Sequence, residues 1–193
     1  PPNPNRIHER LPDPDNATRF RAFLADGEPV VVYVGKLSRE KGVHLLIEAV
    51  RRLGVRAVVV GFGPARTDLE AQADGRVLFT GPLEHAELAC LLALADASVV
   101  PSEFPEAFGM VAAEAASCGC PPVVANHSGL AEIASGLSAS YPEPYRDLPS
   151  FPKGDTDALT DRLRRILALG PADRAAVRHA ARQAVVDRWS WSS

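Results

Sequence analysis

Five short runs of mostly β-branched apolar residues recur along the chain, and a helical pattern follows each of them. The expected strands cover residues 30–34, 57–60, 77–80, 97–100 and 122–125. Runs this short and this apolar are typical of strands buried on both faces of a parallel sheet. The intervening helices are expected at 43–53, 66–73, 84–95, 109–117 and 130–134. Parallel neighbours need a right-handed crossover, so the alternation predicts an α/β fold with a doubly wound, Rossmann-like parallel sheet.

The remaining segments divide around this pattern. Residues 1–28 are rich in Pro, Asn and Asp, with one short helical patch near 18–24, and are expected to be a linker or arm. The length of 193 residues suits one domain, expected over 29–188. Within it, 136–156 is expected to be an irregular surface segment, followed by helices near 157–169 and 171–188.

Composition excludes several functions. A net charge of −3 gives no reason to expect nucleic acid or an anionic membrane as partner, and no apolar run approaches the ~20 residues that cross a bilayer. Cys90, Cys118 and Cys120 form neither a disulfide framework nor a zinc site and are expected to be structural thiols in a reducing cytoplasm. The Asp-x-Asp triplet at 13–15 lies among prolines with no strand before it, so we interpret it as coincidental.

The first expected strand leads into a loop with two lysines. Lys36 and Lys41 lie between Gly35 and Gly42, at the start of a helix, and they are two of only three lysines in the chain. On a doubly wound sheet, ligands bind at the carboxyl ends of the strands. Two cations beside a helix N-terminus suit a diphosphate there. The alternative is a solvated basic turn.

The second strand ends in Gly61-Phe62-Gly63-Pro64. Arg66 stands where a dinucleotide fingerprint has its third glycine, and the motif follows the second strand instead of the first. An NAD site is therefore disfavoured. The glycines are expected to allow a tight turn or a close approach of the backbone to a ligand.

The fourth strand leads to two carboxylates eight residues apart. Pro105 argues against a helix extending back from Glu106, which should lie in a loop, with Glu114 on the following helix. The two could face one ligand, with one carboxylate on sugar hydroxyls and the other on a ribose. The alternative is that Glu106 is a favourable first-turn charge and Glu114 is part of an exposed helix surface.

Together, these motifs are similar in order and spacing to the donor-binding domain of family-4-type retaining glycosyltransferases, which have the two-domain GT-B fold. The resemblance covers roughly residues 30–135. The motifs that carry it are Gly-Lys-Leu-x-x-x-Lys-Gly at 35–42, Gly-x-Gly-Pro at 61–64, Phe79-Thr80-Gly81-x-Leu83, Pro101-Ser102, Glu106-x7-Glu114, Gly119-x-Pro121-x-Val123-Val124-Ala125 and Gly129-Leu130-Ala131-Glu132-Ile133.

The resemblance implies a role for each matching residue. Lys36, at a position where the family usually has arginine, and Lys41 would contact the donor diphosphate. Glu106 would lie near the sugar hydroxyls and Glu114 on the ribose. Lys36, Lys41 and Glu106 are the expected catalytic residues. The other donor-binding positions are Gly35, Gly61, Leu83, Phe108, Gly109 and Met110, with amides near 108–110 meeting the sugar and distal phosphate and Leu83 framing the base.

The implied activity is transfer of a sugar, with retained configuration, from a nucleoside diphosphate sugar (UDP or GDP) to an unknown acceptor. No metal or other cofactor is expected, because lysines and helix amides would stabilise the leaving diphosphate. The resemblance also implies an acceptor-binding domain N-terminal to this one and a crossover segment starting at 189–193. The chain alone is therefore expected to be inactive, and the whole enzyme cytoplasmic, or peripheral at the membrane.

Two alternatives remain open. A sugar-nucleotide 2-epimerase shares the two-domain architecture, although the Glu-x7-Glu pair argues against it. A binding or regulatory module that has lost activity is favoured only by lysine at position 36. Of the histidines, only His127, in a loop at the same edge, could border the donor. His44, His85 and His179 lie on expected helices and are interpreted as surface or core residues.

Overall fold

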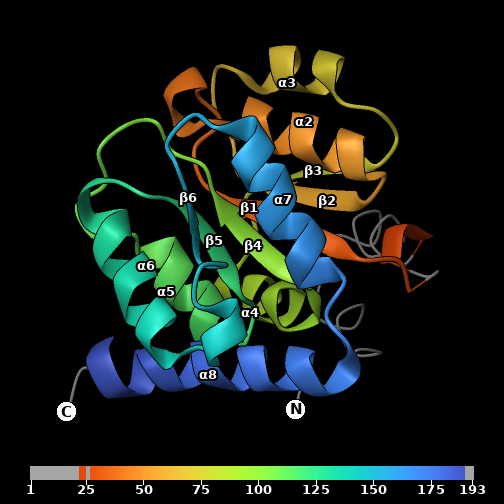
Figure 1. Cartoon of the computed structure of the whole chain (residues 1–193). Helices are drawn as coiled ribbons and strands as arrows, with labels where there is room; N and C mark the ends of the chain where they lie inside the picture. Colours follow the sequence, from red (N-terminus) through yellow and green to blue (C-terminus); the bar gives the residue numbers. More distant parts are fainter. Residues whose placement is uncertain (1–21, 25–26, 190–193) are drawn as a thin grey trace.

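The computed structural model describes residues 22–24 and 27–189. Within them the chain forms a parallel sheet with helices packed on both sides (Figure 1). The Asp-x-Asp triplet at 13–15, most of the expected arm at 1–28, and 190–193 lie outside the described residues. The predicted α/β doubly wound fold is confirmed.

The sheet has one more strand than the sequence predicted. Its order is β3-β2-β1-β4-β5-β6, and every pair in it is parallel. The strands are β1 (Val30–Val34), β2 (Arg56–Val60), β3 (Val77–Gly81), β4 (Ala97–Val100), β5 (Pro122–Ala125) and β6 (Ser150–Phe151). After β3 the chain returns to the other side of β1. The direction of winding therefore reverses between β1 and β4, where a doubly wound sheet opens a crevice for ligands.

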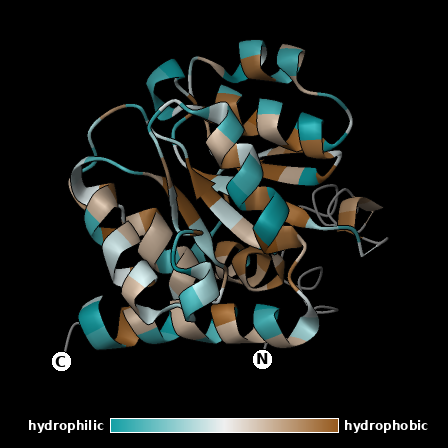
Figure 2. Ribbon diagram, in the orientation of Figure 1, coloured by the Kyte–Doolittle hydropathy of each residue, from teal (hydrophilic) through white to brown (hydrophobic). Residues whose placement is uncertain are grey.

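Helices cover both faces because the strands are apolar on both. In β1, Val31 and Tyr33 join the core cluster that includes α2 (Val43–Leu53) and α7 (Thr156–Leu167), whereas Val30 and Val32 join the one that includes α4 (His85–Leu94). Figure 2 shows the strands as hydrophobic ribbons between helices of mixed polarity. The α-helices are α2 (Val43–Leu53), α3 (Arg66–Gln72), α4 (His85–Leu94), α5 (Met110–Ser117), α6 (Ser128–Ser140), α7 (Thr156–Leu167) and α8 (Pro171–Trp189). Among the described residues, none of the helices is both long and apolar enough to span a bilayer.

The expectation for residues 136–156 is wrong. The predicted short helix at 130–134 continues to Ser140 as α6, and a 3₁₀ turn (Glu143–Tyr145) and strand β6 follow it. The segment is held by buried apolar side chains, because Leu137, Tyr141, Leu148 and Phe151 are each at most 2% exposed. Their irregular spacing among Pro and Ser gives neither a helical nor a strand period, so the sequence pattern concealed them.

The cysteines are free thiols. Burial raises the pKa of Cys120 to about 12, and it also raises the pKa of Cys118. Among the described residues, no three His, Cys, Asp or Glu side chains form a group able to hold a metal ion.

Helix α8 runs along the lower edge of the sheet in Figure 1 and carries arginines at a spacing of four. Arg178 donates to the carbonyls of Ala93 and Ala95 at 2.6 and 2.7 Å, at the end of α4. Arg182 donates in the same way at the end of α5. The last carbonyls of a helix lack partners within the helix and carry partial negative charge, so a guanidinium fork suits them.

We expect Arg178→Ala to lower the free energy of unfolding by about 2–3 kcal/mol, because two part-buried carbonyls lose charge-assisted hydrogen bonds. Urea denaturation measures the change. The matched control is Arg164→Ala, because the Arg164 side chain is 60% exposed and has an ion-pair distance of 3.6 Å to Asp161. We expect the control to cost less than about 0.5 kcal/mol. Equal costs for the two variants would refute the capping role of Arg178.

Candidate functional site

The turn after β1 carries the two lysines and is held in place by the side chain of Tyr33, by the burial of Leu37 and by the neighbouring loop. The Tyr33 hydroxyl donates to the carbonyl of Lys36 at 2.9 Å, and Leu37 is fully buried. The next loop supports the turn at close range, since a Cβ on Gly61 would lie 1.9 Å from the carbonyl oxygen of Gly35. Only glycine permits that approach. The fold therefore presents the lysines on a rigid turn.

The lysine turn also touches the end of β4. Gly42 has a φ of 69°, and a Cβ there would lie 2.0 Å from the carbonyl oxygen of Pro101. The carbonyl of Glu40 accepts hydrogen bonds from the amides of Glu103 and Phe104 at 2.8 and 3.1 Å. These contacts join the loops that follow β1 and β4. The winding of the sheet reverses between these two strands, and we call this place the switch point.

As predicted, Glu106 lies in the β4–α5 loop and Glu114 lies on α5. The Lys41 ammonium is 2.5 Å from the Glu106 carboxylate, and both side chains are about three-quarters buried. The same ammonium lies 5.9 Å from the ring centroid of Phe104. Burial raises the pKa of Tyr33, and the nearby charge of Glu106 raises it further. Tyr33 is therefore a neutral hydroxyl beside this ion pair.

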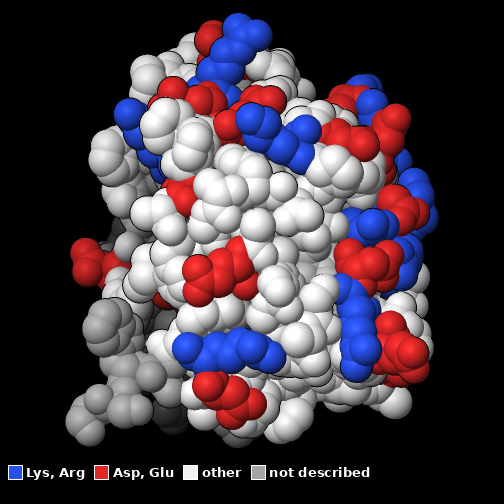
Figure 3. All heavy atoms as spheres, turned by 60° about the vertical axis from the view of Figure 1, so that its left-hand side comes forward, with Lys and Arg blue, Asp and Glu red and all other residues white. Residues whose placement is uncertain are grey.

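A pocket of 360 Å³ lies around this ion pair, at the crevice predicted by the topology. The residues expected from the sequence that line it are Gly35, Lys36, Lys41, Glu106, Phe108, Gly109 and Met110. Its further lining residues are Tyr33, Val34, Val100, Ser102, Ala107 and Val111. Figure 3, which brings the left-hand side of Figure 1 forward, shows charged side chains of both signs along the upper edge of the molecule. The pocket thus combines an apolar wall with two cations and one carboxylate.

Helix α5 points its N-terminus at the pocket. Gly109 is its N-cap, with a φ of 90°, and Met110, which is 57% exposed, is its first residue. The first amides of a helix have no partner within the helix, so they can donate to an anion. Phe108 is held from behind by Trp189 at the end of α8, in an edge contact with ring centroids 6.0 Å apart.

Three expected site residues do not line the pocket. Glu114 is half-buried and lies four residues after Met110 on α5, so it extends the same helix face by one turn. Gly61 supports the lysine turn from below, as described above. Leu83 lies between β3 and α4 and packs partly against the smaller core cluster.

Two polar residues of the pocket lining were not among the expected site residues. Tyr33 interrupts a run of valines at the end of β1, and Ser102 directly follows β4. Both hold polar groups at the carboxyl ends of the strands that flank the switch point, and this position was the available signal.

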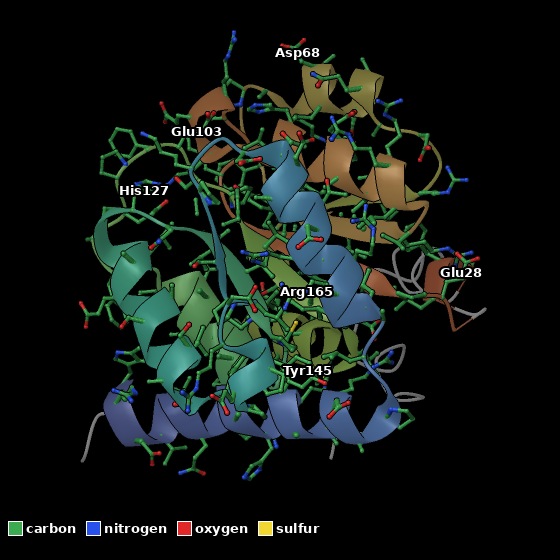
Figure 4. The ribbon with its side chains drawn as sticks, in the orientation of Figure 1. Glu28, Asp68, Glu103, His127, Tyr145 and Arg165 are labelled. Carbon is green, nitrogen blue, oxygen red and sulfur yellow. The ribbon has the colours of Figure 1, made fainter. Side chains whose placement is uncertain are left out.

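The end of the β5–α6 turn and the start of α6 contact the loop that carries Glu106. Nε2 of His127 lies 2.6 Å from the carbonyl oxygen of Ser102, and Nδ1 lies 3.2 Å from the Ser128 hydroxyl. That hydroxyl accepts a hydrogen bond from the amide of Glu106 at 3.0 Å. Figure 4 shows His127 and Glu103 near the same edge of the molecule. His127 thus lies behind the loop that carries Glu106.

A second cavity, of 320 Å³, lies beyond the lysine turn on the side of α2 and α3. It is lined by Arg39, His44, Ala65, Asp68, Leu69 and Gln72. None of these residues belongs to the β4–α5 loop, and the cavity does not reach the crevice between β1 and β4. The larger cavity, with its converging charges, is therefore the better candidate site.

Comparison with known proteins places the chain in one family. The family described as "Glycosyl transferases group 1" matches residues 15–184. The chain is 36% identical over 178 residues to a glycogen synthase of Mycobacterium tuberculosis, covering 86% of this chain and 40% of that protein. It is 34% identical over 192 residues to a D-inositol 3-phosphate glycosyltransferase of Mycobacterium bovis, covering 92% and 38%. The chain therefore spans about two-fifths of the length of these relatives.

Solved structures share the fold. Sucrose-phosphate synthase from Thermosynechococcus elongatus is 29% identical, with a TM-score of 0.75 over 96% of this chain and 47% of that one. Anabaena HepE, solved in complex with UDP-glucose, is 25% identical, with a TM-score of 0.75 over 95% and 51%. The described residues thus match one domain of GT-B glycosyltransferases.

Proposed function

This chain belongs to the group 1 glycosyl transferases, and we propose that its 360 Å³ pocket binds the nucleoside diphosphate sugar used by a retaining, family-4-type enzyme. The observation that carries the proposal is the convergence of Lys36, Lys41, Glu106 and the start of α5 on one cavity. Two cations beside a helix N-terminus suit a diphosphate, and a carboxylate among them suits sugar hydroxyls.

The charges suggest how the bond to the sugar is broken. As the sugar–phosphate bond breaks, negative charge builds on the leaving diphosphate. Lys36, Lys41 and the amides around Gly109 stabilise that charge from fixed positions, so we propose that no metal is needed. Each charge-assisted contact is worth about 1.5–3 kcal/mol. The acceptor attacks from the face of the leaving group, and no protein nucleophile takes part.

We propose that the two carboxylates bind different parts of the donor. Glu106 binds hydroxyls of the transferred sugar, and Glu114, one turn along α5, binds the ribose. Leu83 frames the base. We propose UDP as the preferred nucleotide and GDP as the next. Support comes from HepE, which was solved with UDP-glucose.

We propose that transfer of the sugar requires more than these 193 residues. The chain covers about two-fifths of its curated relatives, and we propose that the acceptor is bound by the remainder of the enzyme. The chain alone then binds the donor without transferring the sugar. Lys36 keeps the charge of the family's usual arginine but not its two-pronged geometry, so it favours a second candidate function, a binding module without activity.

Thermal denaturation of the chain with nucleotides tests donor binding. We expect UDP to raise the melting temperature, and GDP to raise it less. A ligand at ~100 times its Kd stabilises the folded state by about 2.7 kcal/mol, which raises the melting temperature of a domain of this size by several degrees. NAD should cause no shift. A shift with NAD and none with UDP or GDP would refute the proposed function. Turnover of UDP-glucose in the enzyme containing the rest of its sequence separates a transferase from an inactive module.

A further inference from the structure

The loop that carries Glu106 has no regular secondary structure between β4 and α5, yet both polar main-chain groups of Glu106 are bonded. Its amide donates to the Ser128 hydroxyl at 3.0 Å, and its carbonyl accepts from the amide of Gly129 at 2.9 Å. A Cβ on Gly129 would lie 2.2 Å from the carbonyl oxygen of Ala107. The first two residues of α6 therefore hold Glu106 at its main chain.

The hydrogen bonds around Ser128 have only one consistent direction when the imidazole is neutral. The carbonyl of Ser102 can only accept, so Nε2 of His127 carries the proton. Nδ1 is then an acceptor, and the Ser128 hydroxyl donates to it. A lone pair of the same hydroxyl accepts the amide of Glu106. The chain of bonds runs from Glu106 through Ser128 and His127 to the end of β4.

Ser128 adopts a backbone conformation that favours glycine. Its φ of 47° makes it the sole non-glycine residue with positive φ in the described part of the chain. A left-handed conformation is unfavourable for a residue with a Cβ. The hydroxyl makes two hydrogen bonds that a glycine could not, and these offset the strain. Strain maintained beside a binding pocket points to a role of the strained side chain there.

We propose that Ser128, oriented by His127, is a positioning residue that fixes the main chain of Glu106 and thereby sets how well the pocket distinguishes a sugar-bearing nucleotide from the bare nucleotide. The inference rests on the proposed donor site. In this structure the Glu106 carboxylate is bonded to Lys41. When a diphosphate takes that lysine, the carboxylate must turn to the sugar, and a fixed main chain keeps it within reach. Binding of the nucleotide itself does not depend on the hydrogen bond between the Glu106 amide and the Ser128 hydroxyl.

Calorimetric titration of the chain with UDP and with UDP-glucose tests the positioning role. The readout is the ratio of the two dissociation constants, which isolates the contribution of the sugar. We expect Ser128→Ala and Ser128→Gly to lower the preference for UDP-glucose by about fivefold, as for the loss of one hydrogen bond. The Kd of UDP should stay within about twofold of the wild-type value, because the lysine turn is untouched.

Stability separates positioning from a merely structural role. Ser128→Gly relieves the strain at φ 47°, so it should melt no lower than Ser128→Ala although both lose the sugar preference. Ser140→Ala is the matched control, because it removes a hydroxyl at the other end of α6 that donates to the carbonyl of Gly136 within the same helix. It should leave the ratio unchanged. Glu106→Gln provides the reference for a lost sugar contact.

Each outcome has a definite meaning. Loss of sugar preference in both Ser128 variants, with UDP affinity retained, supports the positioning role. An unchanged ratio in them, while Glu106→Gln abolishes the preference, overturns it and leaves the proposed function standing. Weakening of UDP and UDP-glucose by the same factor also overturns it, because that is general damage to the pocket. If the wild-type chain does not bind UDP at all, the proposed donor site fails and the positioning role falls with it.

Discussion

Replacing Lys41 with alanine should weaken UDP binding by about one to two orders of magnitude. The variant loses a charge-assisted hydrogen bond to the diphosphate, worth about 1.5–3 kcal/mol. It also leaves the Glu106 carboxylate without the cation that now lies 2.5 Å away, so the phosphates would meet an unpaired negative charge. Calorimetric titration of UDP measures the loss.

Two further variants make this expectation specific. Lys153 is exposed and lies outside the pocket lining, so Lys153→Ala should change the Kd of UDP by less than about twofold at physiological salt. Glu106→Gln removes the internal competitor for Lys41, so UDP should bind at least as tightly as in the wild type. Full affinity in Lys41→Ala, or equal losses in Lys41→Ala and Glu106→Gln, would contradict the assignment of Lys41 to the diphosphate.

The second large effect concerns Gly42. Gly42→Ala should lower the free energy of unfolding by at least about 3 kcal/mol, since it combines left-handed strain with a collision against a main-chain oxygen. The added Cβ would lie 2.0 Å from the carbonyl oxygen of Pro101, and neither backbone segment can rotate away as a side chain can. Because the collision pushes the lysine turn away from β4, UDP affinity should fall as well. Urea denaturation and titration give the two quantities.

Gly54→Ala separates the two causes. Gly54 has nearly the same φ, 67°, at the opposite end of α2, but a Cβ there meets nothing within 4 Å. Its substitution should cost about 1–2 kcal/mol from strain alone and leave UDP binding unchanged. If Gly42→Ala proved no more harmful than Gly54→Ala, the close contact between the loops after β1 and β4 would have no energetic importance.

The sheet was predictable where its strands are apolar on both faces. Val30–Val34 is a continuous apolar run typical of a strand buried on both faces, and the helices between the strands indicated parallel pairing. Strand β6 has only two residues, and it pairs through Ser150 and Phe151, which carry no pattern. Such a strand is specified by its tertiary contacts, which a local period does not register.

The candidate site was predictable as a set of loops but not as a set of contacts. Placing Lys41 and Glu106 at the same edge followed from the alternation of strands and helices, because both residues lie in loops after the carboxyl ends of parallel strands. Their ion pair joins residues that are 65 positions apart, and it depends on how far each side chain extends from its loop. The hydrogen bonds from Ser128 and Gly129 to the main chain of Glu106 could not be predicted for a different reason. The positive φ of Ser128 arises from the geometry of the chain at the start of α6. A serine in the sequence does not indicate a positive φ, whereas a glycine often does.

A crystal structure of the chain with UDP-glucose bound examines the donor site most directly. We expect diphosphate oxygens within hydrogen-bonding distance of the Lys36 and Lys41 ammonium groups, the contact between Lys41 and Glu106 broken, and the Glu106 carboxylate turned to the glucose. A nucleotide found in the cavity beside α2 and α3, with the Lys41–Glu106 pair intact, would contradict the proposed donor site.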